Sequence, residues 1–252
     1  MDLYVERRGE GRPFVWAHGL TSCIAQEDEV GLFDWGSIPG IALTRYDAPG
    51  HGRSPAPLDD AVYEWRNLAS VMLEVMAASA TVAGGASMGC ATAIYAALAA
   101  PERVTGLVLV IPPTAWATRA AQTDLYLKGA DYVAANGTAA YIERLREMPA
   151  QPPWSAPTRE IGWRHTLAMD PVALPHVLRG AARSDLPGDE DLATIAAPAI
   201  VLAWADDPGH PVSTAEHLVE VLPAASLHVA RSRDEVLAWP RLVESFVASL
   251  DG

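Results

Sequence analysis

Positive charge is scarce in this sequence. Its 252 residues include 18 lysines and arginines against 31 aspartates and glutamates, which gives a formal net charge of −13. A surface of this sign repels phosphate backbones, and lysines and arginines do not cluster anywhere along the chain. Nucleic acid is therefore not an expected partner.

Long apolar runs and cysteines are also scarce. No apolar stretch approaches the ~20 residues that span a bilayer, and the first residues lack the apolar core of a secretory signal. No membrane association is expected, and a cytoplasmic location is the default. Cys23 and Cys90 do not make a disulfide framework, so both are expected to be buried free thiols. Metal-ligand spacings, a P-loop and a dinucleotide fingerprint are all missing, so no metal or cofactor is expected.

What the sequence does contain is an alternation of strand and helix patterns. Half of the residues are apolar and 19% are charged, which is typical of a folded domain with a large core. Strands are predicted at 3–5, 13–17, 41–46, 81–84, 104–111, 198–204 and 226–230, and helices at 61–78, 90–98, 213–222 and 235–250. Alternation of this kind predicts an α/β fold with a mostly parallel central sheet flanked by helices.

Residues 112–191 differ from the rest in lacking any strand pattern. Helical spacing runs over 116–136, 138–148, 159–168 and 172–183, interrupted by a proline-rich break at 149–157. The sequence therefore predicts a core made of residues 1–111 and 192–252, with a helical cap inserted between them.

The segment Gly85-Ala86-Ser87-Met88-Gly89 is the most informative motif. It has the form G-x-S-x-G and lies between a short apolar run and a small-residue helix pattern. Glycines on both sides of the serine permit a sharp, strained turn that exposes the hydroxyl at the end of a strand. We expect Ser87 to be a nucleophile; the alternative is an ordinary turn with a solvent-facing serine.

Polar motifs also follow three other predicted strands, where a parallel sheet binds its ligands. They are His18-Gly19-Leu20 after the second strand, Asp47-Ala48-Pro49-Gly50-His51-Gly52-Arg53-Ser54 after the third, and Asp207 to Pro211 after the penultimate one. With these motifs in order, the sequence resembles the cap-bearing branch of the α/β-hydrolase superfamily. The chain has room for only one strand before residue 13, so the first of that superfamily's usual eight strands is expected to be missing.

The resemblance implies a role for each matching residue. Ser87 matches the nucleophile, and the amides of Leu20 and Met88 match the two donors of an oxyanion hole. His18 and Gly19 match the segment that orients this hole. Asp207 matches the triad acid better than Asp206 does, because of its spacing to Pro211.

The expected triad histidine is missing from its usual place. The loop after the last predicted strand, residues 230–235, contains none, and no histidine follows His228. A serine hydroxyl needs a neighbouring base, so another histidine must serve if the chemistry is retained. His210, three residues beyond Asp207, is the leading candidate, with His18 and His228 as alternatives. His51, His165 and His176 are expected to be structural.

Aromatic residues suggest an apolar substrate pocket, with Trp116 and Trp204 as its expected lining; the alternative is that they only fill the core of the cap. The leading hypothesis is a serine hydrolase acting on a small, mainly apolar carboxylic ester, thioester or lactone. A non-hydrolytic enzyme of the same fold (a lyase, an isomerase or cofactor-free oxygen chemistry) and a ligand-binding protein without catalysis are the alternatives. The expected partner is a small-molecule substrate, and the sequence leaves a homo-oligomer open.

Overall fold

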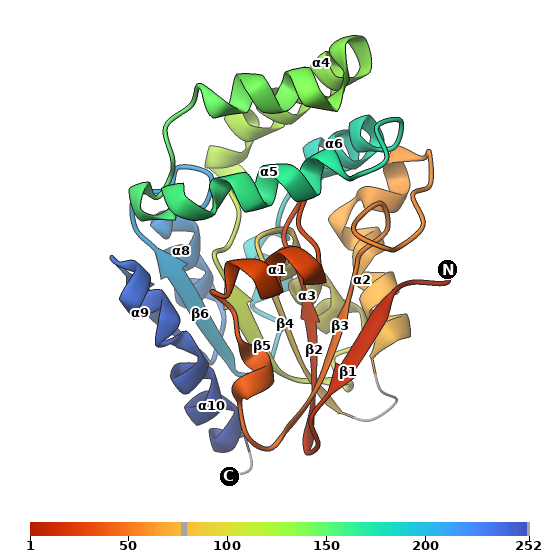
Figure 1. The fold of residues 1–252 in the computed structure, drawn as a ribbon. Coiled ribbons are helices and arrows are strands. Elements are labelled where there is room, and N and C mark those ends of the chain that lie inside the picture. The colour runs from red at the N-terminus through yellow and green to blue at the C-terminus, as the bar shows by residue number, and fades with distance from the viewer. Residues whose placement is uncertain (77–79, 251–252) are drawn as a thin grey trace.

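A seven-stranded sheet forms the centre of the computed structural model, which describes residues 1–76 and 80–250. In those ranges the strand order is β1-β3-β2-β4-β5-β6-β7, and every neighbouring pair is parallel except β1 with β3. The strands are β1 (Val5–Arg8), β2 (Arg12–Ala17), β3 (Ile41–Tyr46), β4 (Thr81–Ala86), β5 (Val104–Val110), β6 (Ala199–Trp204) and β7 (Ala225–Ala230). This arrangement, drawn in Figure 1, confirms the predicted α/β fold with a mostly parallel sheet.

Helices cover both faces of the sheet. Side chains alternate between the faces along each strand, so both faces carry apolar side chains that must be buried. Val15 and Ala17 of β2 face one apolar core, whereas Phe14 and Trp16 face the other. The first core is closed by α2 (Trp65–Val75), α3 (Met88–Ala99) and α8 (Val212–Val221). The second is closed by the segment from α1 (Ile24–Val30) to η1 (Trp35–Ser37) and by α9 (Arg233–Leu237) and α10 (Trp239–Ser249).

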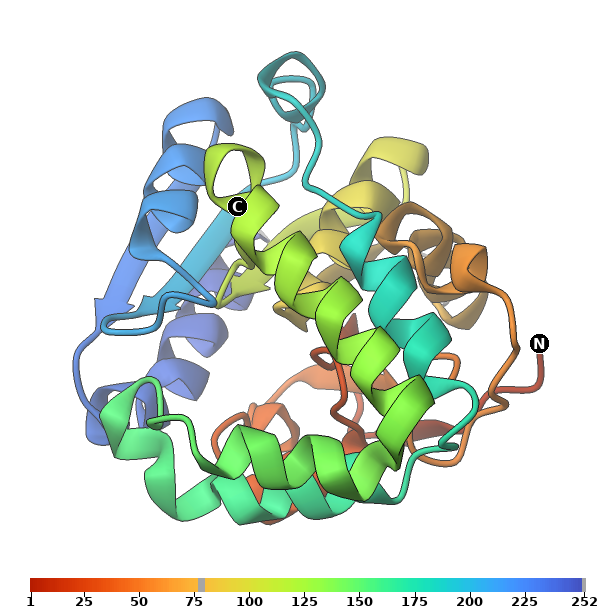
Figure 2. The ribbon, with the colours of Figure 1, turned by 90° about the horizontal axis from the view of Figure 1, so that it is seen from above.

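A helical segment between β5 and β6 lies over one end of the sheet (Figures 1 and 2). It contains η3 (Trp116–Thr118), α4 (Arg119–Arg146), η4 (Pro153–Thr158), α5 (Arg159–Leu167), α6 (Leu174–Ala182) and α7 (Asp189–Leu192). Its own apolar cluster joins α4 and α6 to Tyr63 of η2 (Asp60–Tyr63). The end that it covers is the one where the parallel strands finish. The boundaries at residues 112 and 191 remain a prediction.

Some element boundaries differ from those expected. The first strand begins at Val5 rather than ending there, because residues 5–8 pair with β3. The predicted helix at 61–78 is a short η2 turn followed by α2, and its last two predicted residues lie outside the described ranges. The final helix is divided into α9 and α10 at Ala238. The two predicted cap helices meet at Gly137, whose φ of 83° breaks α4.

Candidate active site

Ser87 occupies the tight turn between β4 and α3. Its φ of 52° and ψ of −109° lie outside the regions that most residues adopt, so the backbone is strained at this position. The flanking glycines make the turn possible because side chains would not fit there. A Cβ on Gly85 would lie 2.3 Å from the Gly89 carbonyl carbon, and a Cβ on Gly89 would lie 2.0 Å from the Ala17 oxygen. The side chain of Ser87 is partly exposed at this end of the sheet.

His210 lies between Ser87 and Asp207. Its Nε2 is 2.9 Å from Ser87 Oγ, and its Nδ1 is 2.8 Å from Asp207 Oδ2. A carboxylate only accepts hydrogen bonds, so Nδ1 carries the proton and Nε2 is free to accept the one from the serine hydroxyl. Asp207 and His210 belong to one turn after β6. A hydrogen bond of 3.1 Å from the His210 backbone N–H to the Asp207 carbonyl oxygen closes this turn.

Asp207 is held by more than the histidine. Its Oδ2 also accepts a hydrogen bond of 2.9 Å from Trp204 Nε1, and its Oδ1 accepts one of 2.9 Å from the Gly209 N–H. Burial alone would raise the pKa of Asp207, but the bond and charge of His210, with the Trp204 and Gly209 donors, hold it below its usual value. Asp207 is therefore an ionised acceptor at neutral pH.

The loop after β2 faces the serine turn. A Cβ added to Gly19 would lie 3.7 Å from Ser87 Cβ, so the backbone of this loop passes directly beside the nucleophile candidate. Neither the Leu20 nor the Met88 N–H has a hydrogen-bond acceptor in the described part of the chain. Both N–H groups are therefore available to a ligand, that of Met88 directly after Ser87 and that of Leu20 directly after Gly19.

Two buried histidines fix this loop from behind. His18 Nε2 accepts a hydrogen bond of 3.0 Å from the Ala48 N–H, and His51 Nε2 accepts one of 3.1 Å from the Thr21 N–H. Burial lowers the pKa of His18 to about 4, and burial together with the neighbouring His18 lowers that of His51 to about 3. Both rings are thus neutral and committed to backbone groups, which leaves neither free to act as a base.

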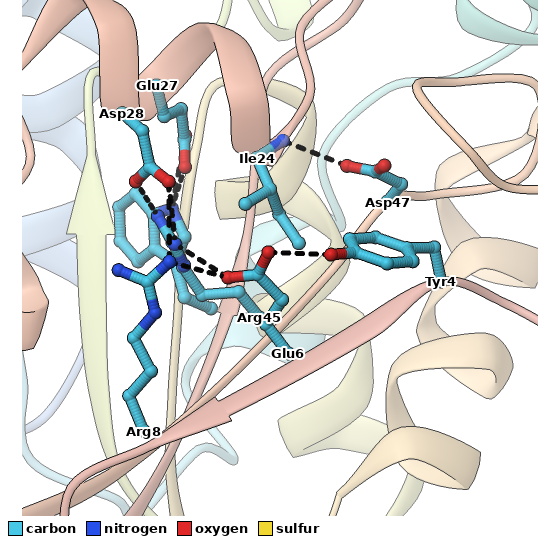
Figure 3. A network of polar contacts seen from close by, with 9 residues as sticks. Tyr4, Glu6, Arg8, Ile24, Glu27, Asp28, Arg45 and Asp47 are labelled. Atoms are coloured by element: carbon cyan, nitrogen blue, oxygen red, sulfur yellow. Dashed lines mark hydrogen bonds and ion pairs between the residues drawn. The ribbon is translucent and has the colours of Figure 1, made fainter.

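Asp47, the first residue of the motif after β3, binds the start of α1, where the loop after β2 ends (Figure 3). Its Oδ1 accepts a hydrogen bond of 2.8 Å from the Ile24 N–H, and its Oδ2 accepts one of 2.9 Å from the Arg53 N–H. Beside it, Arg45 binds Asp28 at 2.5 Å and Glu6 at 3.1 Å. The motif thus holds the end of the loop after β2 in place, a role for Asp47 that its sequence does not reveal.

Glu27 belongs to the same network and has an unusual pKa. Both of its carboxyl oxygens lie within hydrogen-bond distance of Trp16 Nε1, at 3.1 and 2.9 Å. Burial raises the pKa of Glu27 to about 8, despite this donor and the charge of Arg45. Glu27 is therefore mainly protonated at neutral pH, and the charged triplet at 27–29 contributes less negative charge than its sequence suggests.

The two tryptophans expected to line the pocket have different surroundings. Trp204 is only 8% exposed, packs edge-on against Trp154 and His210, and stacks on Trp239. Trp116 lies against His217 and lines a separate hollow of about 440 Å³ between η3, α7 and α8. No described contact joins Trp116 to Ser87 or His210, so its assignment to the substrate pocket remains a prediction.

The remaining candidates lie apart from Ser87. His228 is an exposed residue of β7, and Asp206 is exposed with a φ of 65°. His165 bridges Cys23 and Glu29, whereas His176 binds Asp60 at 2.6 Å. Among the described residues, His210 is the one histidine with a hydrogen bond to the Ser87 hydroxyl.

The comparisons with known proteins agree with the fold. A family model of the alpha/beta hydrolase fold matches residues 13–231. The chain belongs to the α/β-hydrolase fold family. A search of curated proteins found no match to this α/β hydrolase.

Solved structures resemble this α/β hydrolase over nearly its whole length. An enol-lactonase from Burkholderia xenovorans LB400 superposes with a TM-score of 0.78 at 16% identity, covering 98% of this chain and 95% of its own. A thermophilic esterase from Thermogutta terrifontis gives 0.75 at 19% identity, with coverage of 98% and 93%. MenH from S. aureus gives 0.76 at 16%, with coverage of 98% and 97%. The superpositions establish a shared fold, and at identities this low they establish no more than that.

Two further observations concern cofactors and membranes. Within residues 1–76 and 80–250, no group of three or more His, Cys, Asp or Glu side chains is arranged to hold a metal ion. Over the same part of this α/β hydrolase, no helix combines the length and apolar character that a bilayer span requires.

Proposed function

We propose that this protein is a serine hydrolase that cleaves a small, mainly apolar carboxylic ester, thioester or lactone through an acyl-enzyme on Ser87. The observation that carries the proposal is the continuous hydrogen-bond chain from Ser87 Oγ through His210 to Asp207, with distances of 2.9 and 2.8 Å. It supplies the base that the loop after β7 lacks.

In this mechanism Ser87 Oγ attacks the acyl carbon while His210 Nε2 takes the hydroxyl proton. The amides of Leu20 and Met88 stabilise the oxyanion, and Asp207 stabilises the imidazolium. Collapse of the intermediate expels the alkoxide or thiolate, which takes the proton from His210. Water, deprotonated by His210, then attacks the acyl carbon and releases the acid and Ser87.

The apolar preference is supported by the surroundings of Leu20. Its side chain packs against the cap cluster together with Tyr126 and Tyr141. An acyl group bound at the Leu20 amide would therefore approach an apolar surface. The Burkholderia lactonase and the Thermogutta esterase, named for their activities, point to the same bond types.

A fluorophosphonate probe tests the proposal directly. Labelling of Ser87, found by peptide mapping, is expected, together with loss of ester hydrolysis in Ser87→Ala. An unlabelled Ser87 would contradict the proposal. Turnover of Ser87→Ala at the wild-type rate would favour a non-hydrolytic reaction, and ligand-induced stabilisation without turnover would favour a binding protein.

A further inference from the structure

The indole of Trp204 has a polar contact that a substrate-pocket wall does not need. Trp204 is the last residue of β6, and its Nε1 donates a hydrogen bond of 2.9 Å to Asp207 Oδ2. That oxygen is the same one that faces His210 Nδ1 at 2.8 Å. The triad carboxylate therefore shares one oxygen between the histidine and a tryptophan.

We propose that Trp204 is a positioning residue of the catalytic centre, and that its indole N–H fixes the rotamer and charge of Asp207. This inference rests on the proposed function. The acid and base lie on one short turn, so bonds inside that turn cannot fix its orientation toward Ser87. The constraint must come from outside it, and Trp204 is the buried last residue of the strand that leads into the turn.

Packing makes the indole a rigid donor. Its ring stacks on Trp239 of α10, with centroids 6.1 Å apart and planes 18° apart. The ring also packs edge-to-face with Trp154 of η4, with ring centroids 5.1 Å apart and ring planes at 84°. With the side chain 8% exposed, Trp204 cannot turn its N–H away from Asp207 without disturbing both neighbours.

The bond also adjusts the strength of the acid. A donor to a carboxylate stabilises the ionised form, and the Trp204 bond contributes to the lowered pKa of Asp207. Loss of this donor leaves Asp207 a stronger base, with His210 as the one remaining partner of Oδ2 and Gly209 as the partner of Oδ1. We therefore expect Asp207 to lose its ideal alignment with His210 and to be protonated at a higher pH.

Trp204→Phe removes the N–H and keeps an aromatic ring in the stack. We expect kcat for ester hydrolysis to fall about tenfold with KM unchanged, which matches the loss of one hydrogen bond to a charged group. The acidic limb of the pH–rate profile should move to higher pH, because a more basic Asp207 carboxylate stabilises the protonated, inactive imidazole of His210. A purely structural role would not move that limb.

Trp35→Phe is the matched control. Trp35 is also buried in the second core, but its Nε1 has no hydrogen-bond partner among the described residues. The same substitution there removes no bond, so kcat and the pH profile should stay as in wild type. A folded Trp204→Phe variant that behaves like Trp35→Phe would overturn the proposal.

A spectrum of the resting protein gives a readout that does not need catalysis. The chain has eight tryptophans, each with one indole N–H signal in a ¹H–¹⁵N spectrum. Asp207→Asn is expected to shift the Trp204 signal, assigned by through-bond experiments, far more than that of Trp35. An unmoved Trp204 signal would overturn the inference even if Trp204→Phe does not fold. Should Ser87→Ala remain active, the proposed function fails while this spectrum still reports on the bond.

Discussion

His210 has a pattern of neighbours that only one tautomer satisfies. A carboxylate faces Nδ1 and a hydroxyl faces Nε2, so the ring donates on one side and accepts on the other. The two buried histidines of this region, His18 and His51, are occupied by backbone groups. His210, the proposed base, is thus distinguished from them by its partners.

His210→Gln should lower kcat for ester hydrolysis by about 10³-fold or more, since the serine loses its base. Labelling of Ser87 by a fluorophosphonate should slow in parallel. Asp206→Asn is the matched control, because Asp206 is exposed and asparagine accepts its positive φ. Equal activities of His210→Gln and wild type would exclude His210 as the base.

The raised pKa of Glu27 makes the stability of the folded protein depend on pH. Its carboxyl titrates near 4.5 when unfolded and at about 8 when folded, so the folded state alone holds the proton between these values. The stabilisation is full below pH 4.5 and is lost as the pH rises toward 8. Glu27→Gln should therefore gain stability relative to wild type between pH 5.5 and 8.5, by at most about 1.4 kcal/mol per pH unit.

Urea unfolding at both pH values measures this difference. Glu29→Gln serves as the control, because Arg164 and His165 lower the pKa of Glu29 and its titration lies below this range. A constant difference between Glu27→Gln and wild type from pH 5.5 to 8.5 would contradict the assigned burial.

Among the elements, the turn from β4 to α3 has the least room for change. Gly89→Ala would place a methyl group 2.0 Å from the Ala17 oxygen, a backbone atom that cannot move without shifting β2. We expect a loss of at least about 2 kcal/mol in unfolding free energy, together with loss of activity.

Gly162→Ala, inside α5, is expected to change stability in the opposite direction. Within 4 Å the new methyl group would meet only the side-chain nitrogen of Gln26, at 3.4 Å, and alanine favours a helix by about 1 kcal/mol over glycine. Thermal unfolding of both variants checks the pair. A Gly89→Ala protein as stable as wild type would show that the turn can relax.

The elements could be predicted from sequence because their signals are local. Short apolar runs predicted where each strand of the described sheet lies, although the first was placed at 3–5 and β1 is Val5–Arg8. The glycines around Ser87 predicted the strained turn. Contacts between distant segments had no such signal. The bond from Trp204 to Asp207 depends on one side chain's rotamer, and the bond from Asp47 to Ile24 joins two loops. The burial of Glu27 beside Trp16 likewise required the packed structure.

For the whole molecule, the net charge of −13 should influence substrate choice. An anionic ester is repelled over long range, whereas a neutral ester of equal size is not. Raising the ionic strength from about 0.01 M to 0.15 M shortens the screening length from ~30 Å to ~8 Å. We expect kcat/KM to rise severalfold for the anionic ester and to stay constant for the neutral one, measured in parallel assays. Equal salt responses would contradict this expectation.

Asp207 and His210 share one turn, so their backbones move together, while Trp204 just before the turn aligns the carboxylate. A hydrolase whose acid and base come from separate loops must keep three segments in register. Here a displacement of the β6–α8 connection carries the pair as a unit, and only its approach to Ser87 varies. Residues 204–210 could therefore be moved into a related scaffold as one short segment that keeps Trp204 with the pair.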